Sequence, residues 1–149
     1  MPSESHSPPL IIGYGNPFRG DDGVGPYVAA QLGGVVVHQL VPEMAEQIAQ
    51  AESVIFVDAN CSLPPGTVQA LPLEEEPMMT HKSTPGSLLK LSKEVYGKSP
   101  PATLIAIGVT SFELGSPMSP QAQLGAAAAI AQIHQRQREV DPVTQTTNP

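Results

Sequence analysis

Short apolar runs alternate along the chain with stretches that carry apolar residues at helical spacing. The apolar runs are about as long as β-strands and are continuously hydrophobic, which is typical of strands buried on both faces of a parallel sheet. Prolines near the start and glycines near the end mark several of the intervening stretches as helices. We expect strands at 10–14, 35–37, 53–58, 67–73 and 102–109, and helices at 24–32, 43–50, 85–95 and 120–138.

This alternation predicts the fold class. Strands that alternate with helices form an α/β fold with a doubly wound, mostly parallel sheet flanked by helices, and we place the 67–73 strand at an edge. The 149 residues fit a single domain, and no internal repeat or linker divides them. We expect a flexible N-terminus over 1–9, one domain over 10–138 and a disordered tail over 139–149.

The chain also lacks the signals of a membrane or secreted protein. No run approaches the roughly 20 apolar residues that a membrane span requires. The first nine residues are polar and proline-containing, with no basic segment followed by a long apolar stretch, so no secretory signal is visible. No coiled-coil seam argues for an obligate assembly. We therefore expect a monomer in the cytoplasm.

The charge balance narrows the choice of partner. The chain has 14 acidic residues against 7 basic ones, for a net charge of −7, and cannot supply the clustered basic residues that nucleic acids require. Residues 1–81 contain ten acidic residues and a single Lys or Arg residue, Arg19. This half of the chain suits a cation or a basic partner better than a phosphate, although most of these carboxylates are ordinary surface residues.

The glycine-rich segment 13–25 superficially resembles a nucleotide-binding loop. Gly15 and Gly20 have the Walker spacing, but Asp21 stands where that loop needs a lysine. Two adjacent carboxylates at a helix N-terminus repel phosphate and compete for the amides that would bind it. These two carboxylates therefore exclude nucleotide binding by this segment.

Three segments follow strands or precede helices at the edge where α/β sheets bind ligands: 13–25, 58–61 and the loop before residue 85. We expect Asp21 to be a helix N-cap, which leaves Asp22, Asp58 and His81 to face the crevice. Taken singly, these three are a loop carboxylate, a strand-end carboxylate and an exposed histidine. Together they offer two carboxylates and an imidazole, which suits a borderline divalent transition metal with open coordination positions.

The remaining cysteine and histidines do not add to this set. The single cysteine, Cys61, excludes an intramolecular disulfide and any multi-cysteine metal site, and we expect it to be a small buried apolar residue. His6 lies in the N-terminal segment, His134 on the polar side of the last helix, and His38 at a strand end with no evident partner. We leave these three histidines out of the predicted site.

The ordered motifs of the chain resemble those of the [NiFe]-hydrogenase maturation endopeptidases. The opening signature of that family corresponds to residues 12–16 (IGYGN) with 21–25 (DDGVG). Its third-strand motif corresponds to residues 54–59 (VIFVDA), and its histidine loop to residues 79–81 (MTH) with 88–89. Its closing strand and helix start correspond to residues 108–109 and 114–120, so the resemblance spans roughly residues 10–135.

The resemblance implies an aspartyl-type endopeptidase that removes a short C-terminal extension from a [NiFe]-hydrogenase large-subunit precursor once nickel is inserted. The family's first acid, second acid and histidine fall on Asp22, Asp58 and His81. The resemblance assigns them both the catalytic role and contact with nickel, which would be carried by the precursor. A metal that polarises the scissile carbonyl is the economical physical proposal.

One segment departs from many members of the family. Residues 38–43 (HQLVPE) stand where relatives carry a glycine-rich turn, which indicates a subgroup serving bidirectional hydrogenases. In this segment, Gln39 and Glu43 are candidates for lining the cleft, and a solvent-facing position is the alternative for both. Two other functions remain open: a metal-dependent peptidase with other peptide substrates, and a non-catalytic nickel-binding maturation chaperone.

Overall fold

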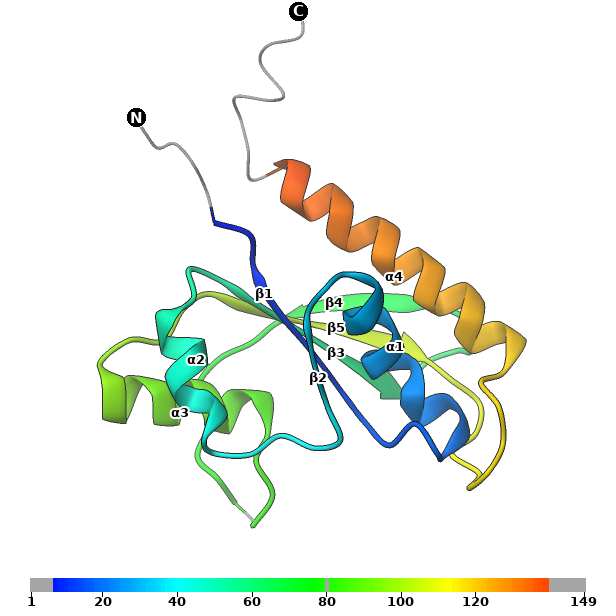
Figure 1. Ribbon diagram of the computed structural model, residues 1–149, viewed down its shortest axis with the longest axis horizontal. Coiled ribbons are helices and arrows are strands. Elements are labelled where there is room, and N and C mark those ends of the chain that lie inside the picture. The colour runs from blue at the N-terminus through cyan, green and yellow to red at the C-terminus, as the bar shows by residue number, and fades with distance from the viewer. Residues whose placement is uncertain (1–6, 80, 140–149) are drawn as a thin grey trace, which may run out of the picture.

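A computed structural model describes residues 7–79 and 81–139 of the chain (Figure 1). Each strand and helix that the sequence predicts is present within these residues, with ends that differ by a few positions. In chain order the elements are β1 (Leu10–Tyr14), the 3-10 helix η1 (Gly20–Gly23), α1 (Val24–Gln31), β2 (Val35–Val37), α2 (Met44–Gln50), β3 (Val54–Asn60), β4 (Val68–Pro72), α3 (Pro85–Tyr96), β5 (Ala102–Gly108) and α4 (Pro120–Glu139).

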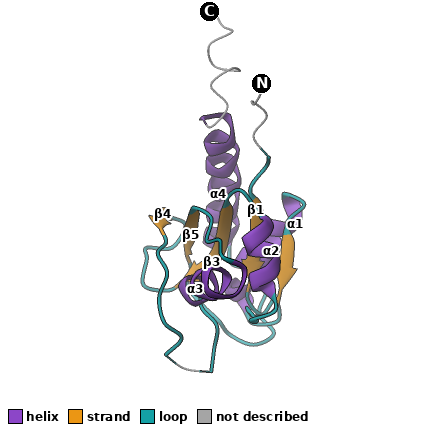
Figure 2. Ribbon diagram, turned by 90° about the vertical axis from the view of Figure 1, so that its left-hand side faces the viewer, coloured by secondary structure: helices purple, strands orange, loops and turns teal. Residues whose placement is uncertain are grey.

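In the described part of the chain the strands form one five-stranded sheet in the order β2-β1-β3-β5-β4. The pairs β1–β2, β1–β3 and β3–β5 are parallel, whereas β4 pairs antiparallel with β5 at the sheet edge. Helices α1 and α4 pack together on one face, and α2 and α3 on the other (Figures 1 and 2). The expected doubly wound, mostly parallel α/β sheet is confirmed, as is the edge position of β4.

The core lies on both faces of the central strands. In β3, Ile55 and Val57 join the cluster under α1 and α4, whereas Val54 and Phe56 join the cluster under α2 and α3. Successive side chains of a strand point to opposite faces, so a strand covered on both faces must be apolar throughout. This explains why these strands read as continuous apolar runs rather than as alternating ones.

The chain marks several helix ends by local chemistry. Thr84 caps α3: its hydroxyl oxygen accepts from the Ser87 amide at 3.1 Å, and the Ser87 hydroxyl oxygen accepts from the Thr84 amide at 2.8 Å. Gly97 ends α3 in the left-handed conformation. The 3-10 helix η1 was not predicted. The expected flexible N-terminus is described only from residue 7, and the expected C-terminal tail lies outside the described residues apart from Glu139.

Two glycines allow α1 to approach the sheet closely. A Cβ atom on Gly13 would overlap the carbonyl oxygen of Gly25, and a Cβ on Gly25 would overlap the carbonyl oxygen of Val57. The start of α1 therefore lies directly against β1 and β3. This contact fixes the segment between β1 and α1, which carries Asp22.

We expect Gly13→Ala to lower the free energy of unfolding by about 3 kcal/mol, because the new methyl group meets rigid backbone. Gly33→Ala is the matched control: Gly33 has a φ of 71°, but no atom lies within 4 Å of the Cβ position. That control should cost only about 1 kcal/mol for the left-handed conformation. Urea unfolding measures both, and equal losses would contradict the close approach.

Candidate functional site

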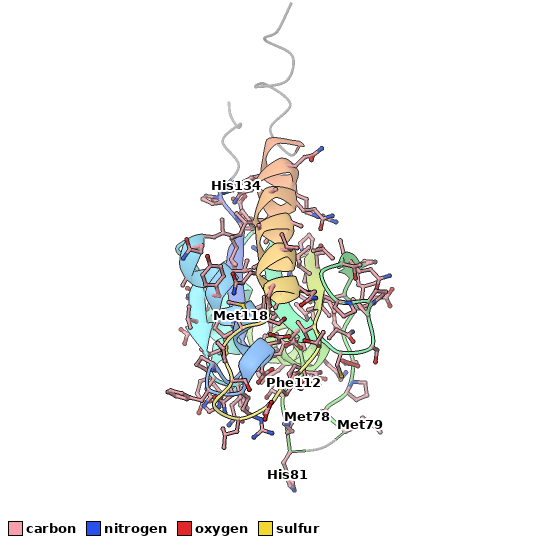
Figure 3. The ribbon with its side chains drawn as sticks, turned by 90° about the vertical axis from the view of Figure 1, so that its right-hand side faces the viewer. Met78, Met79, His81, Phe112, Met118 and His134 are labelled. Carbon is pink, nitrogen blue, oxygen red and sulfur yellow. The ribbon has the colours of Figure 1, made fainter. Side chains whose placement is uncertain are left out.

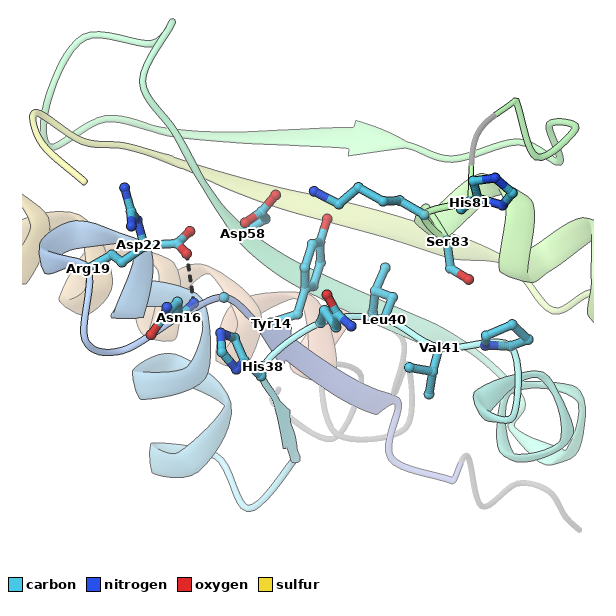
Figure 4. Close-up of a pocket in the computed structure, with 14 residues that line it drawn as sticks. Tyr14, Asn16, Arg19, Asp22, His38, Leu40, Val41, Asp58, His81 and Ser83 are labelled. Atoms are coloured by element: carbon cyan, nitrogen blue, oxygen red, sulfur yellow. Dashed lines mark hydrogen bonds between the residues drawn. The ribbon is translucent and has the colours of Figure 1, made fainter. Parts of the chain in front are cut away.

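A pocket of about 470 Å³ opens at the C-terminal ends of β1 and β3, where an α/β sheet is expected to bind its ligands (Figure 4). Four segments line it: the end of β1 with the segment that follows it into η1, residues 38–42 after β2, the end of β3, and residues 81–83 before α3. Asp22, Asp58 and His81, the three residues predicted from sequence, all line this pocket.

Asp22 reaches the pocket from η1. Its Oδ2 accepts a hydrogen bond from the Asn16 amide at 2.7 Å, so the carboxylate is held against the loop that follows β1 (Figure 4). Gly15 makes this approach possible: its φ is 148°, and a Cβ atom there would overlap the Asp22 carbonyl oxygen. The glycines of this loop thus place a carboxylate, not a phosphate, at the strand end.

Asp58 reaches the pocket from β3, next to Tyr14 at the end of β1. The pairing of Gly13 with Val57 in the two parallel strands brings the next residues, Tyr14 and Asp58, side by side. The Tyr14 hydroxyl interacts with the Asp58 carboxylate and favours its charged form, and the Ala59 amide donates a hydrogen bond to this carboxylate at 2.8 Å. The Tyr14 ring packs edge to face on Phe56, with 6.5 Å between ring centroids and an interplanar angle of 84°.

These surroundings change the acidity of both side chains. Burial raises the pKa of Asp58 to about 6, the negative charge of Asp22 adds to the rise, and the Tyr14 hydroxyl and the hydrogen bond from the Ala59 amide oppose it. Burial also raises the pKa of Tyr14 well above its usual range, helped by the charges of Asp58 and Asp22. Tyr14 therefore stays a hydrogen-bond donor, and the pocket holds two carboxylates that repel each other.

His81 lines the pocket from the segment that precedes α3, and its side chain is exposed. Figure 3 shows it at the far end of this segment, and Figure 4 shows it apart from Asp22 and Asp58. Among residues 7–79 and 81–139, no group of three His, Cys, Asp or Glu side chains is close enough to hold a metal ion. The structure thus brings the three predicted residues to one pocket but not into one coordination cluster, and their role as metal ligands stays a prediction.

Asp21 is not the helix N-cap that we expected: neither η1 nor α1 has a side-chain cap. It is 1% exposed and binds the loop between β5 and α4 instead. Its carboxylate accepts from the amide and hydroxyl of Thr110, both at 3.0 Å, and from the amide and hydroxyl of Ser119, at 2.7 and 2.9 Å. Burial alone would raise the pKa of Asp21, but these hydrogen bonds outweigh it and lower the pKa.

This clamp joins the site to the far end of the chain. The Ser119 hydroxyl oxygen also accepts from the Ala122 amide at 3.1 Å, so the residue that binds Asp21 also caps α4. The Asp21 amide donates to the Ser111 carbonyl oxygen at 2.9 Å. Asp21 therefore fixes the backbone next to Asp22, the residue that lines the pocket.

Some residues of the site were missed. His38, which we set aside, lines the pocket together with Gln39, whereas Glu43 is not among the lining residues. The signal for His38 was available: it directly follows β2, the neighbour of β1 in the sheet, as Asp58 stands at the end of β3. Cys61 is exposed, contrary to the expectation that it is buried.

The chain matches no family model, and no curated protein is significantly similar to it in sequence. Solved structures do share its fold. The hydrogenase maturating endopeptidase HybD from E. coli is 21% identical, with a TM-score of 0.69 over 88% of this chain and 92% of that one. The [NiFe] hydrogenase maturation protease HybD from Thermococcus kodakarensis is 22% identical, with a TM-score of 0.66 over 85% and 96%.

A third structure agrees with these two. The [NiFe] hydrogenase maturation protease HycI from Thermococcus kodakarensis is 24% identical, with a TM-score of 0.65 over 84% of this chain and 89% of that one. The fold that the sequence resemblance implied is thus confirmed over more than four-fifths of the chain. This chain has the fold of the hydrogenase maturation proteases.

Proposed function

We propose that the chain is an endopeptidase that removes the C-terminal extension of a [NiFe]-hydrogenase large-subunit precursor after nickel has been inserted. One observation carries the proposal: Asp22 and Asp58 share a pocket at the strand ends of this particular fold. The similar structures are described as hydrogenase maturation proteases, and the motifs around both carboxylates resemble those of the same family.

Nickel enters this proposal as part of the substrate. The donor set fits a cation, because Asp22 adds to the rise in the Asp58 pKa, and a positive charge at the pocket would relieve this repulsion. Asp22 and Asp58 would hold the nickel of the precursor, with His81 contributed by the segment before α3. A bound divalent ion supplies Lewis-acid polarisation of a carbonyl and a template for the bond to be cut.

The chain's own residues prepare the two carboxylates. The Asn16 amide fixes Asp22, and the Tyr14 hydroxyl and the Ala59 amide fix Asp58. Either role of Asp58, as a nickel contact or as an acceptor of a proton, requires the ionised carboxylate. Cleavage should therefore rise with pH as Asp58 ionises near pH 6.

The finer points of the proposal are its nickel dependence, the subgroup, the location and the oligomeric state. Residues 38–42, where the sequence departs from many members of the family, form a wall of the pocket. We propose that this departure marks the bidirectional-hydrogenase subgroup. We further propose that the chain works as a monomer in the cytoplasm. No helix in residues 7–79 and 81–139 is long and apolar enough to cross a membrane.

The decisive experiment incubates the purified chain with its large-subunit precursor, either nickel-loaded or metal-free, and follows the intact mass of the precursor. We expect the nickel-loaded precursor to lose its extension and the metal-free one to keep it. Asp22→Ala, Asp58→Ala and His81→Ala should each slow cleavage about 100-fold or more. The exposed residues Glu43 and His134 give the matched controls Glu43→Ala and His134→Ala, which should cleave normally.

Each other outcome would assign the chain a different function or a different site. A precursor that binds but keeps its mass would identify a non-catalytic nickel-binding chaperone. Cleavage of metal-free precursor or of unrelated peptides would identify a peptidase of another kind. If Asp22→Ala, Asp58→Ala and His81→Ala all cleave at the normal rate, the site is assigned to the wrong residues.

A further inference from the structure

A second, smaller cavity adjoins the candidate pocket. It has a volume of about 190 Å³ and lies between α3, the segment before α3 and residue 42. Pro42 and Ser83 line both the pocket and this cavity, so the two share a wall. Met78, which lines the cavity, belongs to the same segment as His81 (Figure 3).

The lining of this cavity, hereafter the Met78 cavity, is mainly apolar. Leu88 is buried, Leu91 is half-buried, and Met78 is 54% exposed. The charged residues at the cavity, Lys90 and Glu94, form an ion pair of 3.0 Å with each other. Their charges therefore offset one another, and the cavity favours an apolar group. A methionine side chain adapts well to partners of differing shape.

We propose that the Met78 cavity binds one apolar side chain of the precursor's C-terminal segment, beside the part of the precursor held at Asp22 and Asp58. This inference rests on the proposed function, because the occupant is the same substrate. Small-molecule sites usually measure about 300–1,000 Å³. A cavity of about 190 Å³ suits a single side chain better than a separate ligand.

The shared wall indicates how one peptide reaches both places. Successive residues of an extended segment lie about 3.3 Å apart and point to alternate sides. A segment that passes over Pro42 and Ser83 can therefore place one residue in the acidic pocket and a nearby side chain in the Met78 cavity. The matching substrate is a peptide in which the nickel-bearing region is followed closely by an apolar residue.

Lysine substitutions in the cavity give the first test. Met78→Lys and Leu91→Lys should raise the KM for nickel-loaded precursor about tenfold and leave kcat nearly unchanged, because they remove binding shared by ground state and transition state. Val95→Lys is the matched control: Val95 is an exposed apolar residue of the same helix that does not line the cavity. Because Met78 is exposed, Met78→Lys does not depend on refolding the core.

A binding measurement separates this proposal from the proposed function. The probe is a synthetic peptide with the precursor's C-terminal sequence, and the readout is the ¹³C-methyl NMR signal of Met78. We expect the chemical shift of this methyl group to change when the peptide binds. A peptide in which one apolar residue is replaced by Asp should bind the unmodified chain about tenfold more weakly. The same replacement should not weaken binding to the Met78→Lys variant.

The outcomes are distinct. If the chain does not cleave the precursor but Met78 responds to the peptide in this way, the proposed function fails and the cavity assignment stands. If it cleaves normally and both lysine variants keep the original KM, the cavity assignment alone is overturned. Self-association of the chain that Leu91→Lys abolishes, without any response to peptide, would assign the cavity to a second copy and overturn the proposal.

Discussion

Asp58→Asn is expected to abolish cleavage and at the same time to make the folded protein more stable at pH 8. Burial raises the pKa of Asp58 to about 6 from an ordinary 3.8, so the folded state holds this proton more tightly than the unfolded state does. The associated stability is fully present below pH 3.8 and is lost as the pH rises through about 6. The difference in pKa corresponds to about 3 kcal/mol.

The neutral amide removes this dependence. Asparagine keeps an oxygen that can accept from Tyr14 and Ala59, but it carries no charge that must be buried near Asp22. Urea unfolding from pH 4 to pH 8 should therefore show the variant gaining on the original protein as the pH rises. Glu43→Gln, a change at an exposed carboxylate, supplies the baseline. Parallel stability profiles for Asp58→Asn and the original chain would show that Asp58 ionises without cost.

The second large effect is expected at Asp21. Asp21→Ala should lower the free energy of unfolding by about 4 kcal/mol, because it leaves the amides and hydroxyls of Thr110 and Ser119 without their acceptor. The pKa of Asp21 is lowered in the folded protein, so its contribution is present at neutral pH and is lost only as the pH falls below about 4.

The adjacent residue gives the matched control. Asp22 is half-buried, and its carboxylate accepts a hydrogen bond from the Asn16 amide, so Asp22→Ala should cost only about 1 kcal/mol. Asp22→Ala should stay folded and inactive, whereas Asp21→Ala should unfold at much lower urea. Circular dichroism during urea titration measures both. Equal urea midpoints for the two variants would refute the assignment of a structural role to Asp21 and a functional role to Asp22.

The elements of the fold could be predicted because their signals are local. A continuous apolar run such as residues 54–57 indicates a strand covered on both faces, and Pro85 with Gly97 delimits a helix without reference to the rest of the chain. The rule that ligands bind at strand ends then selected Asp58 correctly for the pocket. The same rule applies to His38, which was left out because it had no evident partner.

The role of Asp21 could not be predicted in this way. Its hydrogen-bond partners lie 89 to 98 positions further along the chain, and no local pattern distinguishes such a clamp from a helix cap. The placement of His81 has a similar origin, since it depends on a segment whose course between β4 and α3 has no periodic pattern. Local sequence thus identified the pocket's carboxylates but not what holds them.

The two edge strands of the sheet, β2 and β4, limit how a peptide can be recognised. One border strand, β2, is three residues long, and the other, β4, ends in Pro72, which lacks an amide hydrogen. Short border strands and prolines discourage the addition of a further strand from another chain. These edges therefore disfavour recognition of a peptide by strand addition, and the proposed substrate is expected to be selected by side-chain shape and charge.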